Sequence, residues 1–415
     1  MADTTLTADV IAKAALASME NEIGWLGEIY RAPEEEFSKE VNGYKIGSTV
    51  NIRRPHDPRP RTGATMDLKN VIEGKVDFTV DKQIGHDFQF TSSDLALNIT
   101  DLTKRVIKPA MINIVGEMAR DVAEQMYQGF YNWVGTPGQT INSFSDFAKG
   151  PERLTEMSVP MADRIALLSP SDNWGMIGSQ TSLFNSGLVG DAYKEGQLGR
   201  VGGVNTFESQ VVPTHTNGTW DATTPLTDGD AQNVTYDTAK NTWTQTLVTD
   251  GWDASATITA GSVFTIAGVY MVNAVTKAST GILQQFVVTS AVTANATTTS
   301  DTNLTISPPI ITSGPHQTVT YSGSFDGLAI TPVGSASTGY KQNMMFHKNA
   351  MALAVVPLAM PEGAVGGSRQ SYKGFSCRVQ PVYDGLNDVS AWRLDILYGR
   401  KLIDPRLGLR ISGTA

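Results

Sequence analysis

The sequence contains a single cysteine, Cys377, and therefore cannot form a disulfide bond within the chain. One cysteine fits a reducing compartment, or a fold large enough to need no covalent cross-link. No stretch approaches the roughly 18 uninterrupted apolar residues of a membrane-spanning helix. The first residues, MADTTLTADVIAKAALASM, lack the basic and apolar segments of a secretory signal. We therefore expect synthesis inside a cell and no membrane partner.

Residues of the common catalytic and metal sites are scarce and scattered. The five histidines show no metal-binding spacing, and one cysteine cannot build a zinc site. Neither a phosphate-binding P-loop nor a nucleophile elbow is present. Asp228 and Asp230 have the spacing of a calcium loop, but the glutamate that completes an EF-hand is missing. The sequence thus predicts no catalytic residue, no metal, no cofactor and no enzyme. Cys377 is expected to be a small buried apolar residue.

Positive charge is also scarce, with 32 lysines and arginines against 41 acidic residues and a net charge of -9. An acidic protein repels polyphosphate, which argues against sequence-specific nucleic-acid binding. The exception is the segment 53–63, RRPHDPRPRTG, which carries Arg53, Arg54, Arg59 and Arg61 among three prolines. This segment grips nucleic acid, is a stiff charged tip that reaches for another protein, or is a solvated loop whose charges pair with nothing. Arginine forks suit carboxylates, which favours the second interpretation.

The middle of the chain lacks glutamate entirely between Glu208 and Glu362. Of the 113 residues in 219–331, 26 are threonine, and short alternating runs follow one another between turn residues. Glutamate favours helices and is absent here, whereas threonine favours strands and is abundant. This composition predicts an antiparallel β-barrel or sandwich. Mixed helix and strand patterns lie on both sides of it, so residues 217–335 are interpreted as a domain inserted into another.

The N-terminal segments predict elements that extend from a compact body. Residues 8–30 carry an apolar stripe at helical spacing, and such a helix docks either on its own domain or on a neighbouring subunit. Residues 41–90 alternate in strand fashion as a long two-stranded excursion, with the arginine-rich segment at its end. The helix stripe consists of Ile11, Ala15, Met19, Ile23, Leu26 and Tyr30.

A second, much longer helix is predicted from Thr100 to Trp133, with Pro109 bending it or marking its true start. Its apolar face comprises Ile107, Met111, Ile114, Met118, Val122, Met126, Phe130 and Trp133. Further predictions are helices over 144–157 and 169–184, a buried strand over 163–170, a buried helix over 343–358 ending near Pro357, and a hairpin over 374–399.

The order of these parts resembles the major capsid (coat) proteins of tailed double-stranded DNA bacteriophages. The resemblance is to the short-tailed-phage type, which has an extra β-barrel insertion domain. Three stretches carry it besides the order of parts: GSVFTIAGVYMVNAVTKASTGILQQFVVTS, MMFHKNAMALAVVPL and WRLDILYGRKLIDPRLGLRI. None of these stretches is a catalytic signature. The resemblance in the order of parts covers nearly the whole chain.

The resemblance implies an α+β fold of the tailed-phage major capsid type. It comprises an N-arm, an E-loop, a P-domain with a spine helix, an A-domain and an inserted antiparallel β-barrel. The implied boundaries are 1–40 for the N-arm, 41–90 for the E-loop, 91–159 for the P-domain with its spine helix at 100–134, 160–216 and 336–385 for the A-domain, 217–335 for the insertion, and 386–415 for C-terminal strands that rejoin the P-domain.

The function implied is a structural protein that self-assembles into the icosahedral head shell enclosing the phage genome. Its partners would be copies of itself in hexamers and pentamers, a scaffolding protein, a portal and, as an option, a decoration protein. Subunit-interface residues are expected at the E-loop tip (Arg53, Arg54, Arg59 and Arg61) and in the N-arm (Ile11, Met19, Ile23 and Leu26). The expected location is the virion, after assembly in the host cytoplasm. The alternative is a β-rich virion surface, decoration or carbohydrate-binding protein.

Overall fold

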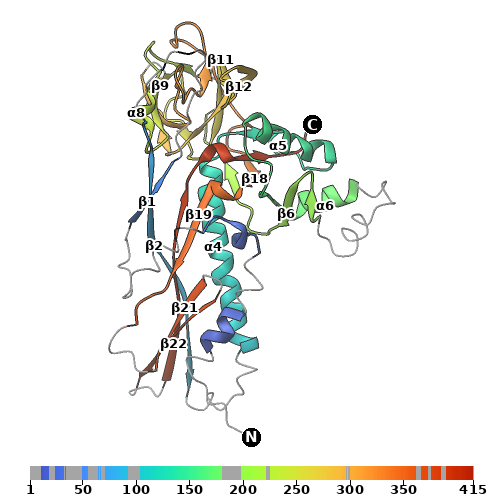
Figure 1. The fold of residues 1–415 in the computed structure, drawn as a ribbon, viewed down its shortest axis with the longest axis vertical. Coiled ribbons are helices and arrows are strands. Elements are labelled where there is room, and N and C mark those ends of the chain that lie inside the picture. Colours follow the sequence, from blue (N-terminus) through green and yellow to red (C-terminus); the bar gives the residue numbers. More distant parts are fainter. Residues whose placement is uncertain are drawn as a thin grey trace. The chain divides into compact units, whose positions relative to one another are not determined.

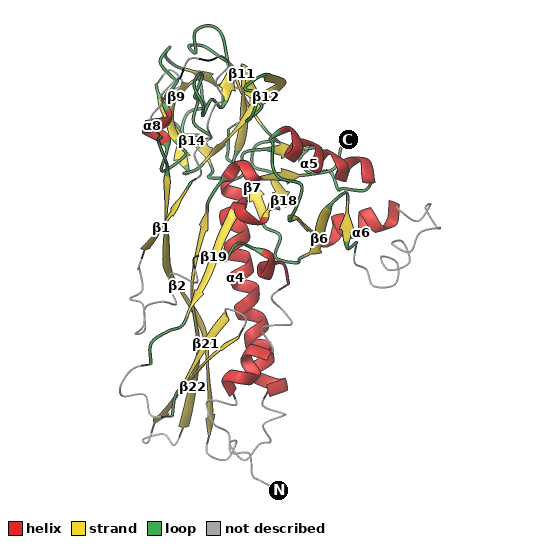
Figure 2. Cartoon of the chain, in the orientation of Figure 1, coloured by secondary structure: helices red, strands yellow, loops and turns green. Residues whose placement is uncertain are grey.

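The computed structural model describes residues 11–17, 24–31, 33, 49–54, 64, 66, 71–91, 103–179, 198–220, 225–295, 297, 300–360, 366–372, 375–384 and 389–414. The chain divides into two compact units, each assembled from separate stretches of sequence. Unit 1 consists of Met1–Ile52, Asp77–Val122 and Met351–Lys401, and unit 2 of Arg53–Val76, Ala123–Ala350 and Leu402–Ala415. Helices and strands both contribute, which confirms the predicted α+β class (Figure 2).

The N-terminal helix predicted over 8–30 is confirmed at 11–17, where the residues are α-helical, but a 3-10 helix, η1, takes its place at Gly24–Glu28. Residues 8–10 and 18–23 of the prediction lie outside the described residues. Gly24 has φ +48°, a left-handed conformation that glycine adopts easily and that does not continue an α-helix. The prediction of an α-helix is therefore wrong at 24–28, because the glycine outweighs the apolar stripe.

The sheet that lies mostly in unit 1 contains six strands in the order β1-β2-β22-β21-β20, with β19 also pairing with β22. Its strands are β1 (Thr49–Arg53), β2 (Lys75–Thr91), β19 (Met351–Val356), β20 (Ser368–Tyr372), β21 (Phe375–Asp384) and β22 (Val389–Leu402). Val76, Phe78 and Val80 of β2 are buried, as their alternation predicts. The predicted hairpin over 374–399 is confirmed by antiparallel pairing of β21 with β22.

The long helix begins as a π-helical turn, η3 (Thr103–Ile107), and continues as α4 (Lys108–Gly129). Pro109 marks the start of the α-helix, as expected, because its missing N–H costs nothing in the first turn. The predicted apolar face is buried from Ile107 to Phe130. In unit 1, α4 runs alongside β22 (Figure 1), and Tyr398 Oη donates to Asp121 Oδ2 across 2.8 Å.

The predicted C-terminal end of this helix at Trp133 is wrong. Trp133 lies in strand β3 (Trp133–Val134), which pairs in parallel with β23 (Gly408–Ile411). The Arg410 N–H donates to Asn132 O across 2.7 Å, so the chain leaves the helix to join a sheet. Strand pairing with a segment almost 280 residues away overrides the local helical spacing, a contact that no local pattern reveals.

The buried helix predicted over 343–358 is also wrong. The segment forms β18 (Asn343–His347) and β19, joined by the 3-10 turn η5 (Lys348–Ala350). Every residue of both strands is buried. A strand covered on both faces appears as a continuous apolar run, which periodicity cannot distinguish from a buried helix.

The second six-stranded sheet belongs to unit 2 and has the order β3-β23-β18-β4-β6-β5. Its other strands are β4 (Arg164–Leu168), β5 (Arg200–Val201) and β6 (Val204–Glu208). Helices α5 (Phe144–Glu156) and α6 (Pro170–Ser179) share one apolar core with it, to which Phe147 and Met176 contribute (Figure 2). The helices and strand predicted between 144 and 179 are confirmed here.

The inserted segment contains a curled, seven-stranded antiparallel sheet in the order β15-β11-β12-β14-β9-β8, with β16 pairing with β11. Its strands are β8 (Leu226–Thr227), β9 (Gln245–Asp250), β11 (Val263–Val272), β12 (Ser279–Val288), β14 (Thr302–Ser307), β15 (Val319–Thr320) and β16 (Ile330–Pro332). A separate apolar core that includes Trp220 and Trp252 lies against it. The all-β character is confirmed, whereas a closed barrel stays a prediction.

The remaining elements are short and lie within the inserted segment, at its two ends or near the C-terminus. They are β7 (Thr214–Thr216), α8 (Tyr236–Ala239), β10 (Thr257–Ile258), β13 (Val292–Thr293), β17 (Gly339–Lys341) and the 3-10 turn η6 (Pro405–Leu407). Strands β7 and β17 pair with each other, so the chain enters and leaves the inserted segment through adjacent antiparallel strands. Among the described helices, none is long and apolar enough to cross a membrane.

Candidate functional site

The predicted interface residues fall into three groups in the structure. Arg59, Arg61, Met19 and Ile23 lie outside the described residues. Ile11 and Leu26 are buried within their own chain, with 2% and 0% exposure. Arg53 is exposed and pairs with Glu73 across 3.5 Å, whereas Arg54 is buried. The subunit-interface role of all these residues stays a prediction, and the described geometry concerns the base of the arginine-rich segment.

Arg54 connects three separate parts of unit 2. Its Nε donates to Ile403 O and its NH1 to Lys240 O, each across 3.2 Å. Its backbone N–H donates to Gly74 O across 2.8 Å, which joins the two ends of the arginine-rich excursion. Burial lowers the pKa of Arg54, and the nearby Asp404 carboxylate opposes that shift. The guanidinium is thus desolvated but hydrogen-bonded, as a buried cation must be.

The other end of the excursion contacts the same turn of the inserted segment. The Lys75 N–H donates to Asn241 Oδ1 across 3.1 Å. Gly74 approaches the turn so closely that an added Cβ would lie 2.2 Å from Lys240 O. We call Arg53, Arg54, Gly74 and Lys75 the loop root, and residues 236–243 the clamp turn. The loop root contacts the clamp turn from both of its strands.

The clamp turn is itself held by aromatic and charged side chains. Trp243, at its end, is 3% exposed and has φ +58°, a left-handed conformation rarely adopted by a bulky residue. Its ring lies near two guanidinium groups, with the Arg406 carbon 5.0 Å and the Arg54 carbon 5.8 Å from the ring centroid. Tyr236, at the other end, stacks on His316 with 3.5 Å between ring centroids. These contacts fix both ends of the turn.

A carboxylate balances the two arginines. Arg406 donates to Asp404 through Nε and NH2, at 3.0 and 2.7 Å, in the fork geometry that favours tight pairing. Burial alone would raise the pKa of Asp404, but the Arg406 charge and hydrogen bonds outweigh it and lower that pKa. Asp404 also accepts from the Arg406 N–H and so caps η6. The IDPR sequence at 403–406 already contains this capping signal.

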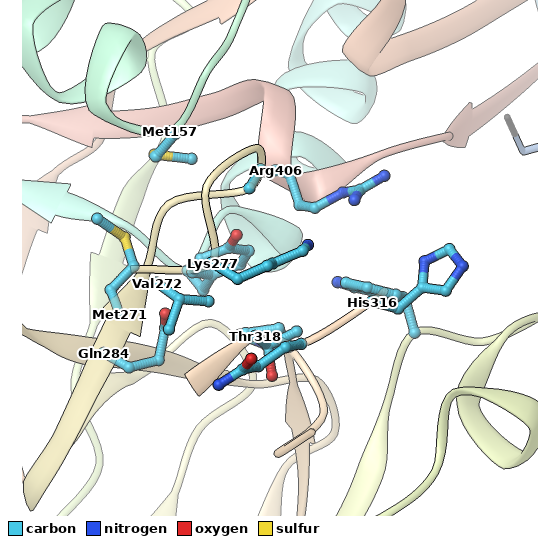
Figure 3. Close-up of a pocket in the computed structure, with 13 residues that line it drawn as sticks. Met157, Met271, Val272, Lys277, Gln284, His316, Thr318 and Arg406 are labelled. Atoms are coloured by element: carbon cyan, nitrogen blue, oxygen red, sulfur yellow. The ribbon is translucent and has the colours of Figure 1, made fainter. Parts of the chain in front are cut away.

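A small cavity adjoins the clamp turn. Its volume is about 50 Å³, and it is lined by Trp243, Arg406, His316, Lys277 and nine other residues of unit 2, shown in Figure 3. Such a space holds a few water molecules, whereas sites for organic ligands occupy roughly 300–1,000 Å³. The described residues contain no group of three or more histidine, cysteine or acidic side chains placed to hold a metal. The cavity is therefore large enough for a few water molecules and too small for an organic ligand.

Cys377, the single thiol, lies in β21 and is fully buried, as expected. Burial raises the pKa of its thiol to about 12, which keeps it protonated and unreactive at neutral pH. Arg164, beside an open depression next to α5, donates all of its contacts to oxygens such as Pro160 O and Val159 O. These polar groups of the described chain are therefore engaged in holding the fold.

The polar clusters described above hold the fold together through hydrogen bonds and ion pairs, and the function is identified by comparison with known proteins. The family model described as "P22 coat protein - gene protein 5" matches residues 34–413. This chain belongs to that coat-protein family. It is a structural major capsid protein that forms the head shell of a bacteriophage and is located in the virion. The resemblance drawn from the order of sequence elements is confirmed.

Comparison with solved structures gives similar proteins at low identity. A chain from Mycobacterium phage Che8 is 12% identical, with 93% of this chain and 89% of that chain covered and a TM-score of 0.46. A chain from the capsid of Ralstonia phage GP4 is 8% identical, with 94% and 91% covered and a TM-score of 0.45. A virus-like particle from Pyrococcus furiosus gives 7% identity, 97% and 98% coverage and a TM-score of 0.43. No curated protein matches the chain.

Sequence patterns missed the clamp turn and its partners Asp404 and Arg406. The turn sequence YDTAKNTW has no apolar period and lies more than 160 residues from either partner. The Asp-Pro-Arg cap was the one available signal, and it indicates a helix start without indicating what the helix contacts.

Proposed function

We propose that the arginine-rich segment is the E-loop tip and that Arg59 and Arg61, together with Arg53, bind carboxylates of an adjacent subunit in the shell. The single observation that carries this proposal is the membership of the coat-protein family over residues 34–413. Arg53 supports it, because its side chain is 84% exposed and its pairing with Glu73, at 3.5 Å, is loose. Exposed pairs of this kind contribute little and are easily exchanged for a better partner.

The N-arm, which precedes the E-loop in the sequence, takes a corresponding role in contacting a neighbouring subunit. Residues 1–40 form this arm in the proposal, and residues 41–90 the E-loop. The spine helix, which is α4 in the structure, belongs to the P-domain, and 217–335 is the inserted domain between the two parts of the A-domain. Extended arms and loops bury area on neighbours through many modest contacts, which lets hundreds of identical chains correct wrong contacts during assembly.

The assembly proposed here consists of hexamers and pentamers, formed in the host cytoplasm with a scaffolding protein and a portal, and open to decoration proteins. No catalytic activity is part of the proposal. The acidic net charge of -9 supports a container for DNA, because packed nucleic acid must not adhere to the wall.

Charge reversal of the tip tests the proposed role. Arg59→Glu combined with Arg61→Glu should leave folded, soluble chains and stop shell closure, because four units of charge change turn attraction to carboxylates into repulsion. Negative-stain electron microscopy of the chain expressed with a scaffolding partner counts closed shells, and far-UV circular dichroism checks the fold.

The matched control is Arg59→Lys combined with Arg61→Lys, which keeps the charge and removes the guanidinium fork. This variant should close shells with reduced yield. Normal shells from the glutamate variant would exclude the proposed role of the tip.

A further inference from the structure

We infer that the clamp turn of the inserted segment holds the loop root and thereby sets the direction in which the arginine-rich loop leaves the chain. The inference rests on the proposed function, because it gives the inserted segment a part in presenting the E-loop to a neighbouring subunit. The contacts that carry it all lie within unit 2 and join Arg54, Gly74 and Lys75 to residues 236–243.

The first step concerns the geometry of the grip. One strand of the excursion is tied to Lys240 O through the Arg54 guanidinium, and the other is tied to Asn241 Oδ1 through the Lys75 amide. The two strands are tied to each other by the Arg54 N–H and Gly74 O. Two bonds from different strands to the clamp turn, together with the bond that joins the strands, fix both position and angle, whereas a single bond would leave a hinge.

The second step is that the fit leaves no room for slippage. The Gly74 Cα faces Lys240 O and Tyr236 Oη, with an imagined Cβ at 2.2 and 3.2 Å from them. Only glycine allows backbone to approach backbone this closely. A shift of the root along its strand direction would bring side chains against this surface, so the register of the root is determined by the turn.

The third step is that the clamp turn resists deformation. Trp243 keeps its left-handed conformation because its ring is buried near Arg54 and Arg406, and because its N–H donates to Ala239 O across 2.7 Å. A strained residue persists only where the surroundings over-determine it. The turn is consequently a rigid support rather than a flexible connection.

The grip also explains how a long excursion is oriented. A two-stranded segment is marginally stable by itself in water, and its direction is then set by whatever holds its base. Here the holding residues are 186 and 349 positions away from Arg54 in sequence, in the inserted segment and in the C-terminal segment. The inserted segment is thereby coupled to the loop.

Two variants of the full-length chain test the inference. Arg54→Met removes the two side-chain donors but keeps an aliphatic side chain in the buried site. Asn241→Ala removes the acceptor of the Lys75 amide at an exposed position, where the fold tolerates the change. Asn241→Asp keeps an acceptor oxygen and should behave as the wild type. Lys240→Ala is the matched control, since it changes a side chain of the clamp turn and leaves the Lys240 carbonyl in place.

Hydrogen–deuterium exchange is measured first, on the unassembled chain. In Arg54→Met and Asn241→Ala, peptides that cover 71–78 should exchange about tenfold faster, while peptides of β11 and β12 should be unchanged. Shell closure is then counted by electron microscopy and should fall several-fold in both variants, with Asn241→Asp and Lys240→Ala close to the wild type. This pair of results supports the inference.

Unchanged exchange at 71–78 in both variants would overturn the inference, whatever happens to assembly. Faster exchange with normal shell closure would overturn it as well, because the root would then be held without consequence for assembly. The proposed function is judged separately. If the Arg59 and Arg61 glutamate variant forms normal shells while Arg54→Met fails to close them, the role of the tip is refuted. The role of the loop root is then retained.

Discussion

At the scale of single residues, Arg410 illustrates how this protein uses charge inside its core. The side chain lies in β23 with 1% exposure and donates to Phe130 O, Gly261 O and Gln342 Oε1, at 2.9, 2.8 and 3.1 Å. Among the residues that the structure describes, no carboxylate forms an ion pair with it. Burial lowers the pKa of Arg410. One guanidinium therefore joins the residue that follows α4, the inserted segment and the residue that precedes β18 through neutral oxygens.

Removing this guanidinium should cost much more than removing an exposed one. Arg410→Met leaves three buried oxygens without a donor, and we expect a loss of about 3 kcal/mol in the free energy of unfolding. Urea denaturation at pH 7 measures it. Arg120→Met, which breaks the exposed pair with Glu117, serves as the control and should cost under about 1 kcal/mol. Equal losses in the two variants would contradict the assigned role of Arg410.

His215 lies close to Arg410 and gives the fold a dependence on pH. Burial and the Arg410 charge lower the pKa of His215 from 6.5 to about 4. Its Nε2 lies 3.3 Å from Ser262 Oγ, and an added Cβ on Gly261 would lie 3.3 Å from its Nδ1. The folded chain thus holds the imidazole neutral in a space with no room for solvent.

The sign of the pH effect follows from this shift. Between pH 6.5 and about 4 the unfolded chain binds a proton at His215 that the folded chain does not, so stability falls as pH falls through this window. The contribution reaches up to about 3 kcal/mol at the acidic end. His215→Gln removes it, and comparing urea denaturation of variant and wild type at pH 7 and pH 4.5 isolates the effect. Parallel losses in both proteins would show that His215 is not responsible.

At the scale of elements, α5 shows how a helix predicted from sequence is fixed at its start. Ser143 is the N-cap, and its Oγ accepts from the Asp146 N–H across 3.1 Å and donates to Asp146 Oδ2 across 2.8 Å. Thr414, near the end of the chain, also donates to Asp146. Burial opposes ionisation of Asp146, but these hydrogen bonds lower its pKa. The cap therefore joins α5 to the C-terminal segment.

Loss of the cap should weaken the helix by the usual amount. Ser143→Ala removes the acceptor of the Asp146 N–H, and we expect a loss of about 1 kcal/mol in the free energy of unfolding. Ser143→Thr keeps the hydroxyl and should lie within about 0.5 kcal/mol of the wild type. Thermal and urea denaturation compare the three proteins. A threonine variant as unstable as the alanine variant would mean that packing, and not the hydroxyl, matters here.

Elements with their own local signal could be predicted from sequence. Alternation predicted β2, and local sequence patterns predicted α5 and α6, the latter with serine and aspartate at its start. The errors occurred where distant strands decide the local structure. Residues 343–347 form a strand and not a helix because β18 pairs with β4 on one side and with β23 on the other. The end of α4 is set by the pairing of β3 with β23.

At the scale of the whole molecule, the order of parts was more informative than any motif. The acidic, threonine-rich stretch between two mixed regions located the inserted segment, and it forms its own apolar core. The predicted site at the arginine-rich segment could be recognised by its composition. Its root could not, because the Arg54 contacts join residues 186 and 349 positions apart. Composition shows which side chains a segment contains, whereas its long-range contacts, which determine its position, cannot be predicted from local sequence.

The pairing of β7 with β17 has a consequence for how such a chain can change over time. Thr216 lies opposite Gly339, so the polypeptide departs and returns at neighbouring points of one small sheet. Genetic exchange between viruses can then lengthen or shorten the stretch between those points without stretching the host scaffold, provided that the clamp turn and Gly261, which bind the rest of unit 2, are kept. The same junction offers engineers a place to graft cargo or epitopes onto a particle.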